Sequence, residues 1–196
     1  MTVTGIDAIQ SGAPVTGTGG LKFADRNVDL PVDAIKPLSA PDFVEGGYIG
    51  EEGVTRTVDA TDDKIKAWGG DAVKVIRSEH AITYQFEFME SANANVLKLI
   101  YGAEHVKIEG TSISIEQTAK LPLRKAFILD MADGGAHIRE VIHDGQLTVT
   151  GDVQFVHSDV IRYAVQIEAF PDNKGVKARS YIDYPESQED DPVPGD

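Results

Sequence analysis

Residues 82–88 alternate strictly between apolar and polar side chains. Ile82, Tyr84, Phe86 and Phe88 fall on one face, while Thr83, Gln85, Glu87 and Met89 fall on the other. Successive side chains of a β-strand point to opposite faces of the sheet. This period of two therefore predicts a half-buried strand within residues 72–90.

Shorter alternating runs occur along the rest of the chain, and Asp- and Gly-containing turns separate many of them. We expect strands within 20–25, 43–60, 105–110, 112–117, 124–132, 136–143, 146–155, 160–172 and 175–185. The dipeptide Asp144-Gly145 predicts a turn between two of these runs. Many short strands with closely spaced turns are typical of an antiparallel β-sandwich or barrel, so the chain is predicted to be mainly β.

One segment has a different period and predicts a short flanking α-helix over residues 91–101. Val96, Leu97, Ile100 and Tyr101 lie at helical spacing. Ser91 is a candidate N-cap, and Gly102 is suited to the position just after the last turn. We interpret this helix as a lid over one opening of the sheet, with a subunit interface as the alternative.

Composition limits the classes of function. The chain has 196 residues, with 18 Lys and Arg against 32 Asp and Glu, so its net charge of −14 argues against binding nucleic acid through phosphate contacts. No apolar run is long enough to cross a membrane, and the first 20 residues predict no secretory signal. We divide the chain into a flexible N-terminal arm (1–20), one domain (21–185) and an acidic disordered tail (186–196).

No pattern of residues indicates an active site or a metal site. The chain has no cysteine, and its histidines (His80, His105, His137, His143 and His157) lack the spacing of a helical zinc site. The acidic run 59–63 lacks the spacing of a calcium loop, and the glycines of 16–20 lack the rest of a phosphate-binding loop. We therefore expect no catalytic residue, no metal and no cofactor.

The segment 61–71, TDDKIKAWGGD, contains the only tryptophan of the chain in otherwise polar surroundings. A large aromatic ring is unfavourable in water, so Trp68 is expected to contact something apolar. Two partners are open to it. Trp68 folds back onto its own sheet, or it contacts another subunit.

The middle of the chain resembles the major tail tube proteins of long-tailed siphophages, in particular those of phages that infect actinobacteria. The shared elements stand in order over residues 43–102. They are GYIGEEGV at 47–54, a polar segment that ends in Trp68, a strand with FEF at 86–88, and NVLKLIYG at 95–102.

This resemblance implies a β-sandwich subunit that forms hexameric rings, which stack into a hollow tail tube in the virion after assembly in the host cytoplasm. It implies tape-measure, tail-tip and tail terminator proteins as partners, and double-stranded DNA that passes through the lumen without specific binding. In such a tube the loop over 60–72 reaches the adjacent ring. The candidate contacts between subunits or rings are Thr61, Asp62, Asp63, Lys64, Ile65, Lys66 and Trp68.

The charge of −14 then has two readings, simple solubility or a net negative lumen that repels DNA. Other functions are kept as alternatives. They are a tail terminator or a capsid decoration protein, a carbohydrate-binding sandwich, and a hydrolase on a jelly-roll scaffold. The number of stacked rings distinguishes these virion proteins from a tube protein, because a terminator stops at one ring, whereas a tube protein polymerises.

Overall fold

The computed structural model describes residues 8–16, 20–38 and 41–184. Over these residues the chain is mainly β with one α-helix, as predicted. The strands are β1 (Ala13–Pro14), β2 (Leu21–Ala24), β3 (Val44–Glu45), β4 (Thr55–Lys66), β5 (Ala72–Phe88), β6 (Val106–Glu109), β7 (Ser112–Ile115), β8 (Lys125–Asp133), β9 (Ala136–Val149), β10 (Tyr163–Phe170) and β11 (Arg179–Asp183). The helix α1 spans Ala94–Tyr101, and a 3₁₀ turn, η2, follows at Ala103–His105.

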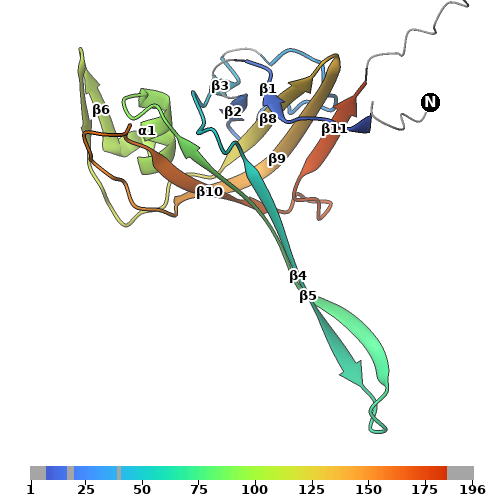
Figure 1. Cartoon of the computed structure of the whole chain (residues 1–196). Coiled ribbons are helices and arrows are strands. Elements are labelled where there is room, and N and C mark those ends of the chain that lie inside the picture. The colour runs from blue at the N-terminus through green and yellow to red at the C-terminus, as the bar shows by residue number, and fades with distance from the viewer. Residues whose placement is uncertain (1–7, 17–19, 39–40, 185–196) are drawn as a thin grey trace, which may run out of the picture.

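Nine of the described strands form one antiparallel sheet. Seven of them follow the order β3-β2-β8-β9-β10-β5-β4, and β1 and β11 pair with β8 and β9 beside this path. Strand β9 divides its free side between two partners, with β11 along its first half and β10 along its second half. Strand β8 likewise pairs with β2 and then with β1. These divisions fold the described sheet into a sandwich-like body, which does not close into a barrel (Figure 1).

The predicted apolar face of residues 82–88 packs in the core. Tyr84, Phe86 and Phe88 are buried, and the rings of Phe86 and Phe88 meet edge to face with centroids 5.0 Å apart. Val165 and Ile167 of β10 lie opposite Phe86 and Tyr84 in the register of the sheet. The same alternation leaves the other side of β5 and β10 polar, so along these two strands the core lies on one face of the sheet. Strand β8 is buried on both faces, because the successive residues from Ala126 to Asp130 are all buried.

Helix α1 closes part of this core, with Val96, Leu97 and Ile100 buried. Its N-cap is Asn93, whose Oδ1 accepts hydrogen bonds from the backbone N–H of Asn95 at 2.9 Å and of Val96 at 3.4 Å. The predicted cap, Ser91, is therefore wrong by two residues. The expected glycine at the end of the helix is confirmed, because Gly102 has φ +91, which L-residues rarely adopt.

The turn predicted at Asp144-Gly145 is absent, and β9 runs through both residues without interruption. Gly145 serves close packing instead. A Cβ at this position would lie 2.8 Å from side-chain atoms of Phe127 and Ile167, both fully buried. The glycine lets two large side chains reach the backbone of β9. The hairpin predicted across Gly110 is confirmed as β6–β7.

Most of the segment 60–72, which the sequence suggests is a loop, continues strands β4 and β5. Together these strands form a long hairpin that projects from the body (Figure 1), and we call its exposed part, residues 55–80, the arm. The N-terminal segment 1–20, predicted to be flexible, is a different part of the chain, and its residues 13 and 14 form β1 on the edge of β8. Residues 1–7 and the predicted acidic tail, 186–196, lie outside the described residues.

Candidate assembly surface

The arm extends well beyond the sheet to which it belongs. Strand β10 pairs with β5 only from Thr83 to Phe88, whereas β4 and β5 remain paired to Lys66 and Ala72. Every residue from 55 to 80 is exposed. At roughly 3.3 Å per strand residue, the part of β5 that precedes Thr83 adds about 35 Å to the body. Such a ribbon extends the reach of the subunit, but its residues make few contacts with the core.

A tight turn closes the arm and carries Trp68. The backbone N–H of Ala67 donates to the carbonyl of Asp71, and that of Gly70 donates to the carbonyl of Ala67, both at 2.8 Å. Gly70 has φ +94, which makes glycine necessary there. Trp68 is completely exposed, with a relative accessibility of 106%. The indole of Trp68 therefore does not pack on the sheet of its own subunit, which was one of the two partners considered for it.

The other predicted contact residues all lie on the outer part of β4, but they do not form one surface. Strand alternation directs Asp62, Lys64 and Lys66 to one face of the ribbon and Thr61, Asp63 and Ile65 to the other. A β-bulge at Ser78, between the pairs Thr61–Glu79 and Asp62–Arg77, interrupts the register. The two faces thus present different side chains to any neighbouring molecule.

One cross-strand ion pair fixes the middle of the arm. Arg77 donates from Nε and Nη2 to the two carboxylate oxygens of Asp62, at 2.8 and 3.3 Å. This hydrogen bond lowers the pKa of Asp62 from its ordinary value and raises that of Arg77. Both side chains are exposed to solvent, so the pair orients the strands more than it stabilises them.

The arm also exposes aliphatic side chains that the sequence does not single out. Val58, Val73, Val75 and Ile76 are between 41% and 62% exposed. Val and Ile are common in β-strands, so the sequence gives no sign that these side chains are exposed. The structure shows that no second layer of the described chain covers them. Together with Trp68 they give the otherwise polar arm several exposed apolar side chains, which no other described part of the subunit covers.

The root of the arm is anchored by a buried carboxylate, Glu140 of β9. It accepts hydrogen bonds from the Tyr84 hydroxyl at 3.0 Å and from Nη1 of Arg56 at 3.1 Å, and a third from the Ser180 hydroxyl. Burial, and then the charge of Glu140, raise the pKa of Tyr84 above its ordinary value. These four residues are far apart in sequence, so no local pattern predicts the cluster, which ties β4 and β5 to β9 and β11.

A second contact braces the opposite strand of the arm. Lys177 donates from Nζ to the carbonyl oxygen of His80, at the point where β5 leaves the sheet. The loop that carries Lys177 is organised by Asp172, which accepts from the backbone N–H of Lys174 at 2.8 Å and of Val176 at 2.9 Å. A hydrogen bond from Arg179 lowers the pKa of Asp172 to about 2.

The outward face of β4, β5, β10 and β9 is polar and free of basic strand residues. Register and alternation place the following polar residues on it, up to the bulge, and Ala81, Ala164 and Phe170 lie among them: Thr55, Thr57, Asp59, Thr61, Glu79, Thr83, Gln85, Glu87, Gln146, Thr148, Gln166 and Glu168. We call this set the polar face. Three arginines reach its margins. Arg162 pairs with Glu87 at 3.5 Å, and Arg124 and Arg26 pair with Asp144 at 3.1 and 3.0 Å. The polar face is therefore neutral to acidic over its breadth.

The described part of the chain contains no group of three or more His, Cys, Asp or Glu side chains that could hold a metal ion. No helix among the described residues has the length and apolar character needed to span a bilayer. The features that stand out are surfaces, namely the arm and the polar face.

Comparison with known proteins gives a family and a distant structural neighbour. A sequence model of a family described as "Phage tail tube protein" matches residues 10–186. A search among curated proteins gave no match. Among solved structures, the tube-terminating cap of the anti-feeding prophage superposes with a TM-score of 0.46 at 8% identity, covering 88% of this chain and 93% of that one.

Proposed function

Because this chain belongs to the phage tail tube protein family, we propose that it is the repeating subunit of a tail tube whose hexameric rings stack and conduct the genome from capsid to host. Membership in the family makes it a structural component of the virion rather than an enzyme. Family membership does not establish the number of subunits in a ring, the stacking of rings or the passage of DNA, and these three points are our proposal.

The observation that carries the proposal is the arm, which exposes every residue from 55 to 80 and ends in a fully exposed Trp68. A monomer gains nothing from holding an indole and several aliphatic side chains in water. A subunit that must hold the next ring does gain from it. In the proposed tube the arm reaches the adjacent ring, and Thr61, Asp62, Asp63, Lys64, Ile65, Lys66 and Trp68 are its contact residues.

The polar face is the proposed wall of the lumen. DNA carries about one negative charge per 1.7 Å of its axis, and basic groups along its path would hold it by accumulated attraction. The polar face offers Asp59, Glu79, Glu87 and Glu168 and no Lys or Arg among its strand residues. A neutral to acidic wall would repel the duplex within a screening length of about 8 Å. Tape-measure, tail-tip and terminator proteins complete the proposed set of partners.

Negative-stain microscopy of the purified protein at high concentration tests the proposed assembly. Stacked tubes with six subunits around each ring are expected. Single rings that never stack would instead favour a tail terminator. The absence of rings and tubes at every concentration, with the protein still folded by circular dichroism, would contradict self-assembly through the arm.

A charge change on the polar face tests its position in the lumen. Virions with Glu168→Lys are expected to assemble normal tubes but to release DNA more slowly, because a cation is repeated in every subunit along the path. The same change at Glu52, which lies in an exposed turn outside the polar face, is the matched control. Equal release rates for both variants would place the polar face elsewhere than in the lumen.

A further inference from the structure

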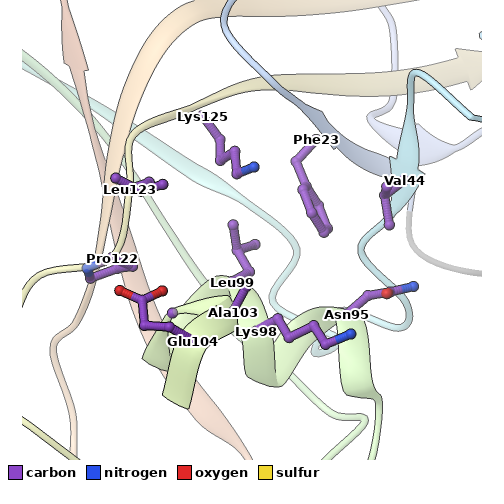
Figure 2. Close-up of a pocket in the computed structure, with 11 residues that line it drawn as sticks. Phe23, Val44, Asn95, Lys98, Leu99, Ala103, Glu104, Pro122, Leu123 and Lys125 are labelled. Atoms are coloured by element: carbon purple, nitrogen blue, oxygen red, sulfur yellow. The ribbon is translucent and has the colours of Figure 1, made fainter. Parts of the chain in front are cut away.

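The described part of the body has two adjoining hollows, which share Val44 and Asn95 in their linings. The smaller one is a cavity beside α1, on the side of the body away from the arm tip (Figure 1). It lies between α1, the strands β2 and β3, and the segment that leads into β8, and it has a volume of about 190 Å³. Figure 2 shows Phe23, Val44 and Leu99 turned toward this space, with Lys98 and Glu104 nearby. Leu123, which is 72% exposed, stands at its mouth. The cavity is apolar inside and charged at the rim.

The size of the cavity indicates what it can hold. Pockets for drug-sized small molecules usually have volumes of about 300–1,000 Å³, and this cavity is smaller. It has room for one large side chain. The atoms that line an unfilled apolar space lack dispersion partners on that side, so a well-fitting apolar group would be favoured there.

The same chain supplies such a group at its other end. Trp68 lies at the tip of the arm with its side chain fully exposed, and Figure 1 shows α1 and the arm tip on opposite sides of the body. Identical subunits that associate head to tail join two different patches, one from each end. We propose that the cavity beside α1 receives the indole of Trp68 from a second copy of this chain. The inference rests on the proposed function, because it requires the arm to reach another subunit.

The charges around the two partners complement one another. Lys66 and Asp71 flank the turn that carries Trp68, so the tip presents one cation and one anion. The rim of the cavity presents Glu104 and Lys98, and it also includes Lys125, which is paired with Asp25. Glu104 already accepts a hydrogen bond from Lys120 at 2.7 Å, and its side chain remains 45% exposed, which leaves it accessible to a second cation. An indole seated between these groups would place Lys66 near Glu104 or Asp71 near Lys98.

Photo-crosslinking from the tip tests this docking directly. Protein with benzoylphenylalanine in place of Trp68 is mixed into an excess of unmodified chain, so that assembly does not depend on the variant, and is irradiated after tubes have formed. Crosslinks to the residues that line the cavity of another copy are expected, namely Phe23, Val44 and those within 95–104 and 122–125. Crosslinks to any other part of a second copy would overturn this inference and leave the proposed stacking intact. Failure to form tubes at all would overturn both.

Filling the cavity gives an independent test. Ala103 lines the cavity and is exposed, so Ala103→Phe should occupy the space without disturbing the fold. The yield of crosslinks to the cavity is expected to fall by about tenfold or more, the effect of losing one strong interface contact. Leu121→Phe, on an exposed residue that does not line the cavity, is the matched control. Equal yields from the two variants would overturn the assignment.

Discussion

The replacement Trp68→Ala separates the folding of the subunit from its assembly. The ring is completely exposed in the isolated chain. Substitutions at such positions usually change the free energy of unfolding by no more than about 0.5 kcal/mol. We therefore expect the variant to show the circular dichroism spectrum and the urea midpoint of the unmodified protein.

Assembly should respond much more strongly. A tryptophan that becomes buried removes roughly 150–250 Å² from water, and at about 25 cal/mol per Å² this contributes at most 4–6 kcal/mol. Ordering the arm and the side chain reduces the gain. The truncation of a strong interface residue costs about 2 kcal/mol or more. This corresponds to a rise of roughly 30-fold in the critical concentration for tube formation.

The critical concentration is measured by sedimenting tubes from a dilution series, with microscopy to identify them. Trp68→Phe retains an aromatic ring and should give an intermediate value. Val73→Ala removes an exposed aliphatic group from the same arm and controls for nonspecific loss of apolar surface. An unchanged critical concentration for Trp68→Ala would refute the role of the ring in assembly, and a variant that fails to fold would refute its exposure.

Three further predictions concern the body. Glu140→Ala should lower the free energy of unfolding by about 1–3 kcal/mol in urea titrations, because it leaves the buried Tyr84 hydroxyl without its acceptor. Gly145→Ala should destabilise by about 1–3 kcal/mol through overpacking, whereas Gly69→Ala, which has no atom within 4 Å of its new methyl group, should be neutral. The pKa of Asp172 is lowered from 3.8 to about 2, so its contribution to stability is complete above about pH 4 and is lost as the pH falls toward 2. Asp172→Asn should therefore remove part of the acid sensitivity seen by circular dichroism between these values.

The elements that bury one clear face could be predicted from the sequence. The alternation from Ile82 to Phe88 identified the inner part of β5 because one face meets the core and the other meets solvent. The helical spacing of Val96, Leu97 and Ile100 identified α1 for the same reason. In both cases a local pattern records a tertiary environment.

Strands were expected within 43–60 and 72–90, but the outer part of the arm between them could not be predicted in this way. The segment TRTVDATDDKIK forms a strand with neither face buried, so its residues carry no period that burial would impose. The turn predicted at Asp144-Gly145 was wrong because a glycine has the same appearance in a sequence whether it forms a turn or makes room for neighbouring side chains. Gly145 makes room for Phe127 and Ile167. The Glu140 cluster and the cavity beside α1 join residues from distant segments, and no local signal precedes them.

The absence of a second layer over the arm also determines how the unassembled subunit behaves. A two-stranded ribbon is at best marginally stable by itself in water, and segments with few buried contacts open at low free energy. The amide protons of β4, and those of β5 that precede Thr83, should therefore exchange with deuterium far faster than those of β8 and β9. A protease should cut the free subunit first near the tip. Docking against a neighbour would protect both, so exchange and cleavage would report the order in which subunits join a growing polymer.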